Sequence, residues 1–220
     1  MADDPDSLIE ATIERFLQRD VSPHVHALEK SDTYPEAIVA RMRELGLFGA
    51  TISAEYGGLA LSCTTYAAIV ERIARVWMSL TGIFNSHLIM SAIVERHGTT
   101  AQKRAYLPKF ATGDLRGGLA LTEPDCGTDL QAIRTTARRD GDHYIVNGTK
   151  TWISNGIHGS CFALLVKTNP AAEPRHRGMS MLLAERGRVS PSAASWKSSA
   201  TRVSTAPNWC STATAFPPTG

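Results

Sequence analysis

The sequence predicts an α+β protein in which an N-terminal all-helical domain precedes a smaller domain of short β-strands. Up to about residue 116, apolar residues recur at the three- and four-residue spacing of amphipathic helices. After Gly117 the pattern changes to apolar runs bounded by turn residues, as in short strands. From Arg186 onward the chain holds no Asp, Glu, Leu or Ile. These changes divide the chain into residues 1–116, 117–185 and 186–220, and helices followed by strands define a segregated α+β chain.

The helices of the first domain follow from apolar spacing and from end signals. Apolar residues recur with a helical period in the first helix, at Leu8, Ile9, Ile13, Phe16 and Leu17. Gly46 ends the third helix. Ser62 caps a long apolar helix, and Thr99 starts the last one. The expected helices cover residues 7–19, 25–30, 36–45, 64–76, a stretch that contains residues 88–94, and 101–109.

Short strands and turns follow in the second domain. An apolar strand ends at Thr122, because Glu123-Pro124 removes a backbone donor and a loop over residues 125–129 comes next. Asp140-Gly141-Asp142 predicts a turn, and Asn147-Gly148 is a strong hairpin signal. The strand after that hairpin is expected to end with Trp152, Ile153 and Ser154. The expected strands are 119–122, 133–138, 144–146, the one after Asn147-Gly148, 161–167 and 179–183.

Composition excludes several classes of function. A net charge of +2 argues against a dedicated nucleic-acid binder. The chain has no run of 18 apolar residues, and its acidic start differs from the basic start of a signal peptide, so no integral membrane segment and a cytoplasmic location are expected. The four cysteines show no metal-ligand spacing, so free thiols and no metal site are expected.

The stretch from Leu119 to Gly156 resembles the flavin-binding signature of the acyl-CoA dehydrogenases. It contains Ala-Leu-Thr-Glu-Pro ending at Pro124, Gly127-Thr128-Asp129, Asn147-Gly148, Lys150 and Trp-Ile-Ser-Asn-Gly ending at Gly156. Segments of the first domain, such as Gly-Leu-Phe-Gly and Glu-Tyr-Gly-Gly, resemble the same family, so the resemblance spans about Ile9 to Glu185. It implies a helical domain, a small flavin-binding β-barrel, and a third, helical-bundle domain that this chain is expected to lack.

The resemblance also implies a cofactor, partners and site residues. FAD is the expected cofactor, an acyl-CoA the substrate, and an electron-transfer flavoprotein the electron acceptor; the intact family forms homo-oligomers. Trp152 would pack beside the flavin, Ser154 would donate to its N5, and Thr122 would bond its pyrimidine edge. Thr128 would meet acyl-CoA or the flavin phosphates. The expected cofactor-binding residues are Leu119, Leu121, Thr122, Gly127, Thr128, Trp152, Ile153 and Ser154.

Taken without the resemblance, two of these residues have simpler interpretations. Trp152 would be a hairpin tryptophan that fills a core, and Thr128 would be a turn hydroxyl that satisfies its own loop. Asp125-Cys126 replaces a Gly-Ala pair common in the family, and Cys126 would narrow the loop.

No catalytic residue is expected among these 220 residues. The reaction that the resemblance implies is α,β-dehydrogenation of an acyl thioester, in which a carboxylate removes the α-proton and the β-hydrogen leaves as hydride. Glu123 is declined as that base, because in the resembling enzymes this glutamate is structural and the base lies in the third domain. His87 and His97 are interpreted as packed or surface histidines rather than catalysts.

The tail from Arg186 differs from everything before it. Every one of the 21 acidic residues lies at or before Glu185. Roughly a third of the tail is Ser or Thr, a composition that predicts disorder. Read in a shifted frame, Val189 to Gly220 yields Glu-Lys-Leu-Gly and Glu-Leu-Val-Phe segments that are similar to the family's continuation. The hypothesis is therefore a one-base frameshift near residues 186–189 with early termination.

A truncated acyl-CoA dehydrogenase with weak flavin binding and negligible activity is the function expected from these observations. Two alternatives remain open at this point. The chain would be a non-catalytic module that binds acyl-CoA or docks on a full-length homologue, or a flavin-dependent oxidase or monooxygenase of the same fold.

Overall fold

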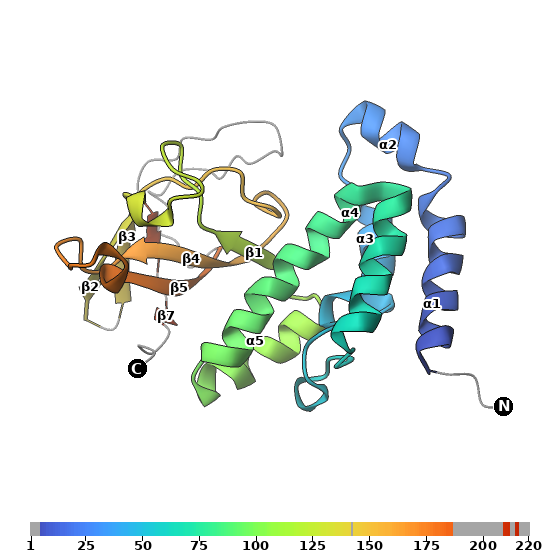
Figure 1. Ribbon diagram of the computed structural model, residues 1–220, viewed down its shortest axis with the longest axis horizontal. Coiled ribbons are helices and arrows are strands. Elements are labelled where there is room, and N and C mark those ends of the chain that lie inside the picture. The colour runs from blue at the N-terminus through green and yellow to red at the C-terminus, as the bar shows by residue number, and fades with distance from the viewer. Residues whose placement is uncertain (1–4, 142, 187–208, 212–213, 216–220) are drawn as a thin grey trace.

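The structure is a computed structural model that describes residues 5–141, 143–186, 209–211 and 214–215. Helices occupy one side of the molecule and the sheet the other, with α1 at the outer edge of the helical side (Figure 1). The predicted class is confirmed, because a helical domain is followed by a mixed sheet.

The helices match the predicted segments closely. They are α1 (Pro5–Phe16), α2 (Val25–Ser31), α3 (Glu36–Glu44), α4 (Cys63–His97) and α5 (Thr100–Ala111). After α1 the chain continues as a π-helical turn, Leu17–Val21. Thr99 and Gln102 form a reciprocal capping box at the start of α5, which satisfies backbone donors that a helix leaves unpaired.

Helix α4 is the centre of the first domain and is kinked at Trp77. This residue has φ −154° and ψ 97°, so two helical segments meet there, which agrees with the separate helices predicted before and after Val76. Twelve residues of α4 are buried. The helix is long and apolar enough to cross a membrane by length and hydropathy alone, but its kink and its packing in a core are those of a core helix.

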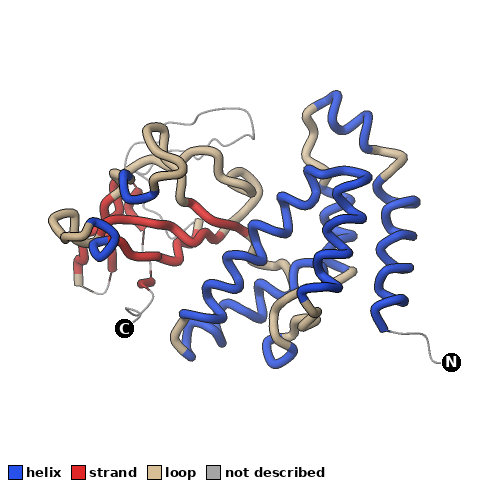
Figure 2. Tube along the Cα trace, in the orientation of Figure 1, coloured by secondary structure: helices blue, strands red, loops and turns tan. Residues whose placement is uncertain are grey.

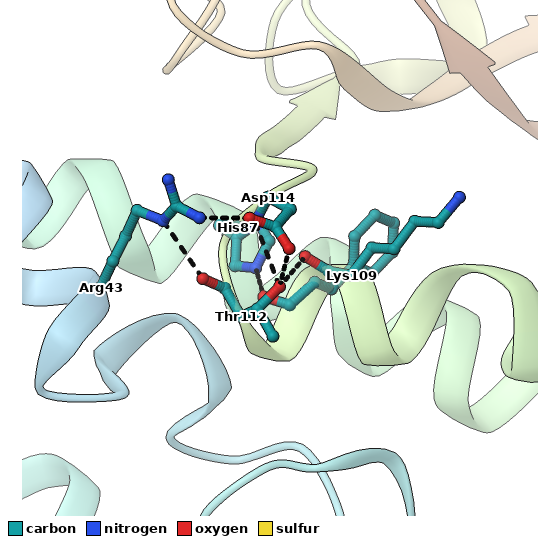
Figure 3. Close-up of polar contacts among 6 residues, drawn as sticks. Arg43, His87, Lys109, Thr112 and Asp114 are labelled. Carbon is teal, nitrogen blue, oxygen red and sulfur yellow. Dashed lines mark hydrogen bonds and ion pairs between the residues drawn. The ribbon is translucent and has the colours of Figure 1, made fainter.

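The segment between α5 and the sheet is fixed by Arg43 of α3 (Figure 3). The Arg43 guanidinium donates to the Thr112 carbonyl at 3.2 Å and pairs with Asp114, and the Thr112 hydroxyl donates to Asp114 at 2.7 Å. Gly113 between them has φ +71°, a conformation that glycine adopts without strain. These bonds set the direction in which the chain enters the first strand.

The sheet combines parallel and antiparallel pairs. Its strands are β1 (Gly117–Ala120), β2 (Thr136–Asp140), β3 (His143–Asn147), β4 (Cys161–Lys167) and β5 (Met179–Glu185). Strand β4 pairs parallel with β1 and antiparallel with β5, and β2 pairs antiparallel with β3. The β1–β4 approach is so close that a Cβ on Gly117 would lie 1.4 Å from the Cys161 carbonyl oxygen.

The hairpin predicted at Asn147-Gly148 is wrong. Asn147 is the last residue of β3 and lies opposite Thr136, the first residue of β2, so the turn of this hairpin is at residues 140–143, where Asp140-Gly141-Asp142 also predicted one. No strand is assigned at residues 148–160 of the described chain, which runs as loop to β4 (Figure 2). Trp152, Ile153 and Ser154 therefore lie on a loop and not at a strand end.

The predicted disorder of residues 186–220 falls mostly outside the described residues. Within that tail the structure describes Arg186 and two short strands, β6 (Trp209–Ser211) and β7 (Thr214–Ala215). Strand β6 pairs antiparallel with β3, and β7 pairs antiparallel with β5, so these two segments extend the sheet at both ends.

Candidate functional site

A cleft of about 670 Å³ lies where the helical domain meets the sheet domain. Three parts of the chain line it: α2 with the turn that follows it, α4 from Trp77 to Ile83, and the loop from Trp152 to His158. The volume is that of a site for a cofactor or a small substrate. The boundary between two domains is a common place for such a site.

Trp152 brings a large aromatic surface to this cleft. Its side chain is 53% exposed, and its backbone has φ +57°, in the left-handed region that a bulky residue rarely adopts. Ile153, the next residue, is buried in the core of the sheet domain and anchors the loop there. Exposed aromatic surface and backbone strain are both costly, and such strain gathers at ligand sites. Ser154 follows on the same lining with an exposed side chain.

Asn155 ties this loop to both domains. Its side-chain amide donates to the carbonyl of Ile83 in α4 and to the carbonyl of Gly117 in β1, each at 2.7 Å. Asn155 also has positive φ, +62°, which asparagine tolerates better than most residues. The position of Trp152 and Ser154 over the cleft is therefore set by contacts to a helix and to a strand.

Thr122 lies beside the same loop. Its carbonyl accepts a hydrogen bond from the Thr151 backbone N–H at 2.9 Å, so it is adjacent to the residue before Trp152. The carbonyl of Leu121 accepts from the Lys150 ammonium at 2.8 Å. The segment after β1 and the segment before Trp152 thus run together, and the structure brings Thr122 close to Trp152 although Thr122 is not part of the cleft lining.

Glu123 and Lys150 form a buried ion pair under these segments. The Lys150 Nζ and Glu123 Oε1 atoms are 2.8 Å apart, and the side chains are 6% exposed or less. The Glu123 carboxylate also accepts from the backbone N–H groups of Arg134 and Thr135, at 2.6 and 3.0 Å. Burial alone would raise the pKa of Glu123, but these hydrogen bonds and the Lys150 charge hold that pKa below its usual 4.5. A carboxylate bonded in this way has a structural role and is not available as a base.

The loop that carries Gly127 and Thr128 lies apart from the cleft lining. Glu123 and Cys126 exchange backbone hydrogen bonds of 2.9 and 3.2 Å, which makes the tight turn before Gly127. A Cβ on Gly127 would meet nothing within 4 Å, and Thr128 is exposed. Leu119 is half-buried against the core of the helical domain. Five of the predicted site residues are thus absent from the cleft lining: Leu119, Leu121, Thr122, Gly127 and Thr128.

Several residues of the cleft lining were not singled out from the sequence as site residues, and four of them form two pairs. Trp77 donates from its indole Nε1 to Glu29 of α2 at 2.9 Å. Tyr34 and His158 stack with ring centroids 3.5 Å apart and an interplanar angle of 12°. These pairs join residues 48 and 124 positions apart, a separation for which no local sequence signal exists.

The histidine and cysteine interpretations can be compared with the structure directly. His87 is fully buried and shares a hydrogen bond of 3.0 Å with the Phe110 carbonyl, so it is a packed residue, whereas His97 is exposed on the surface. Cys63, Cys126 and Cys161 are free thiols. Among the described residues, no group of His, Cys, Asp and Glu has the arrangement of a metal site.

The fold and the cleft define a class of two-domain protein in which a helical domain and a mixed sheet enclose a ligand site at their boundary. Two models of known domain families match this chain: residues 4–114 match the acyl-CoA dehydrogenase N-terminal domain, and residues 118–207 match the acyl-CoA dehydrogenase middle domain. The chain belongs to the acyl-CoA dehydrogenase family. The middle-domain match extends beyond Glu185, where the resemblance had been expected to end.

Curated relatives and solved structures agree with this assignment. The chain is 36% identical over 180 residues to (2S)-methylsuccinyl-CoA dehydrogenase of Cereibacter sphaeroides, covering 81% of this chain and 33% of the relative. It is 32% identical over 180 residues to mitochondrial isovaleryl-CoA dehydrogenase of Pongo abelii, covering 80% and 42%. The chain therefore spans less than half the length of these curated relatives.

Two crystal structures have similar folds. An acyl-CoA dehydrogenase from Geobacillus kaustophilus has a TM-score of 0.83 at 34% identity, covering 97% of this chain and 57% of the other. A glutaryl-CoA dehydrogenase from Mycobacterium smegmatis in complex with FADH2 has a TM-score of 0.75 at 26% identity, covering 98% and 54%.

Proposed function

We propose that this chain forms the flavin-facing and thioester-facing part of an FAD-dependent acyl-CoA dehydrogenase. The reaction is α,β-dehydrogenation of an acyl-CoA. The observation that carries the proposal is the exposed, strained Trp152 beside Ser154 on an open cleft between the two domains. Family membership and the relative solved with FADH2 support the cofactor.

The residues present fit a flavin. Its ring system is flat and apolar with polar edges, so it needs an aromatic wall and hydrogen-bonding groups near its rim. Trp152 offers the wall, Ser154 offers a hydroxyl from the same loop, and Thr122 lies one backbone hydrogen bond away from that loop. Bound FAD would be the acceptor of the hydride that leaves the β-carbon of the thioester.

In this proposal the chain's own residues bind and orient FAD and the acyl-CoA, and they do not remove the α-proton of the thioester. Glu123 is committed to Lys150 and to two backbone N–H groups, which leaves it structural. We propose accordingly that these 220 residues alone bind FAD weakly and turn over acyl-CoA negligibly. An electron-transfer flavoprotein is the proposed electron acceptor.

The test is titration of the purified chain with FAD, in which the change in flavin fluorescence measures binding. We expect saturable binding that Trp152→Ala weakens by roughly tenfold, the effect of about 1.4 kcal/mol of lost contact. Met78→Ala is the matched control, since Met78 is exposed on α4 but does not line the cleft. Absence of FAD binding, or equal binding by the Trp152 variant, would contradict the flavin site. Bleaching of the flavin by an added acyl-CoA would contradict the proposed lack of turnover.

A further inference from the structure

Residues 22–34, which contain α2, form the least buried wall of the cleft. No residue of this segment is buried, whereas Val21 just before it and Pro35 just after it are buried. Figure 1 shows α2 at the edge of the helical domain with a loop at each end. The half-buried side chains of the segment are those of Val25, Leu28 and Tyr34. A segment with so few buried apolar contacts opens at a low free energy compared with the rest of a fold.

The backbone hydrogen bonds of this segment also stay local. The N–H groups of Asp32 and Thr33 donate to the carbonyls of Glu29 and Leu28 in α2. Asp32 has φ +49°, so the chain leaves α2 through a left-handed residue. Among the residues that the structure describes, no backbone hydrogen bond joins 22–34 to α4 or to the sheet. The segment can therefore shift without breaking a bond of that kind.

Two side-chain contacts hold the segment against the rest of the cleft. The Glu29 carboxylate accepts from the indole Nε1 of Trp77 at 2.9 Å, and Trp77 is a buried residue of α4. The Tyr34 ring stacks on His158 with ring centroids 3.5 Å apart. Arg116 adds a longer hydrogen bond, 3.3 Å, to the Tyr34 hydroxyl. A hydrogen bond and a ring stack each contribute a modest net free energy, so contacts of this kind break and re-form in a folded protein.

The walls that face this segment are held more firmly. Helix α4 is the buried centre of the helical domain, and its cleft-lining residue Leu80 is fully buried. The loop at residues 152–158 is fixed by the buried Ile153 and by the two hydrogen bonds of the Asn155 amide. A loosely held wall thus faces two fixed ones.

From this arrangement we propose that residues 22–34 form a flap, which opens and closes over the cleft while α4 and the loop at residues 152–158 stay in place. The flap controls the access of ligands to the cleft. Its ends are fixed by the buried residues on either side, and the contacts with Trp77 and His158 are its two latches. This role depends on the cleft and not on which ligand enters it, so it goes beyond the proposed function.

The test is hydrogen–deuterium exchange of the whole chain, read by mass spectrometry as protection factors of backbone amides. We expect residues 24–34 to exchange at least roughly 100-fold faster than the buried part of α4. Low urea concentrations should leave exchange in residues 24–34 unaltered, because opening the flap exposes little surface, but should speed exchange in α4. Equal protection and an equal response to urea in both segments would overturn the flap.

Removal of a latch tests the cause. Glu29→Ala and His158→Ala each remove one contact, and each should lower the protection factors of residues 24–34 by roughly three- to tenfold. Alanine favours a helix at least as well as glutamate, so this loss in Glu29→Ala cannot come from fraying of α2. Unaltered protection in both variants would mean that exchange occurs with the latches closed, and the flap would be refuted.

Two control variants separate the latches from other contacts. Lys30→Ala trims an exposed side chain of α2 that makes neither latch, and should change the protection factors of residues 24–34 by less than about twofold. Tyr66→Phe removes the hydrogen bond from the Tyr66 hydroxyl to Asn85, and should lower protection in α4 but not in the flap. A loss of flap protection in Tyr66→Phe would show that residues 24–34 open only with the whole chain, which contradicts the flap.

FAD then tests access to the cleft. Because a ligand in the cleft contacts this wall, saturating FAD should raise the protection factors of residues 24–34 by roughly tenfold or more. FAD that binds but leaves this protection unaltered would overturn the role of the flap in access. FAD that fails to bind would overturn the proposed function, and exchange in the wild-type chain and in the latch variants would still decide the flap.

Discussion

The side-chain amide of Asn155 donates to the carbonyl oxygen of Ile83 at 2.7 Å, although the two residues are 72 positions apart. The same amide reaches the Gly117 carbonyl, so a single side chain holds a loop of the sheet domain against helix α4 and strand β1. Trp152 and Ser154, which are proposed to face the flavin, depend on this anchor.

Loss of the Asn155 amide should weaken both the fold and the site. Asn155→Gly keeps the positive φ but removes both hydrogen bonds, and we expect a loss of about 1–3 kcal/mol in the free energy of unfolding with weaker FAD binding. Urea denaturation and FAD titration measure the two effects. Ala60→Gly is the control: Ala60 has φ +50° outside the cleft, so this change should stabilise slightly and leave FAD binding unaltered. An Asn155→Gly variant with normal FAD affinity would refute the anchoring role.

Replacing Lys150 alone should lower the free energy of unfolding more than replacing both Lys150 and Glu123. Lys150→Met leaves the Glu123 carboxylate buried without its counter-ion, and we expect about 3–5 kcal/mol of destabilisation. The double variant Glu123→Gln with Lys150→Met should recover part of that loss, because no isolated charge remains. Urea denaturation of the single and double variants gives the comparison; a double variant less stable than Lys150→Met would contradict it.

His87 predicts a pH dependence of stability. Burial, with Arg116 adding to its effect, lowers the pKa of His87 to about 4 from 6.5, against hydrogen bonding to the Phe110 and Phe48 backbone. The unfolded chain then binds one more proton than the folded chain between these values. This contribution is complete above pH 6.5 and falls by about 1.4 kcal/mol per pH unit as the pH drops toward 4. Urea denaturation between pH 4 and pH 6.5 should show this dependence of the free energy of unfolding on pH, and His87→Leu should reduce the slope by the His87 contribution. An unchanged slope in the variant would exclude His87 as its source.

Because β1 and β4 lie so close together, Gly117 should not tolerate replacement by a residue with a side chain. Gly117→Ala would place a methyl group on the Cys161 carbonyl, so we expect more than about 3 kcal/mol of destabilisation or no folded protein. Gly127→Ala meets open space and should change stability by less than about 0.5 kcal/mol. Thermal unfolding of the two variants checks the difference, and equal melting temperatures would contradict the register of this pair.

Local periodicity was enough to predict the helices and most strands. The apolar faces of α1 and α3 and the run at Cys161–Lys167 are contiguous patterns whose burial follows from their spacing. The same reasoning failed at Asn147-Gly148, because the neighbouring Asp140-Gly141 turn already closes the β2–β3 hairpin. A dipeptide signal cannot show which of two nearby turns pairs the strands.

Sequence could group the candidate site residues only where they lie within one stretch of the chain. Trp152, Ser154 and Thr122 fall in one signature, and the structure brings them together. The stacking of Tyr34 on His158 and the bond of Trp77 to Glu29 depend on tertiary packing between distant segments. The positive φ of Trp152 also has no counterpart in the side chain's own preferences, because packing of its neighbours imposes it.

Trp77 and Trp152 stand on different domains and border the same cleft. Each opposing surface thus carries its own indole chromophore. Any closing of the helical domain on the sheet domain would change the separation and the solvation of these two indoles. A change in intrinsic tryptophan fluorescence would therefore report such a movement without an attached dye.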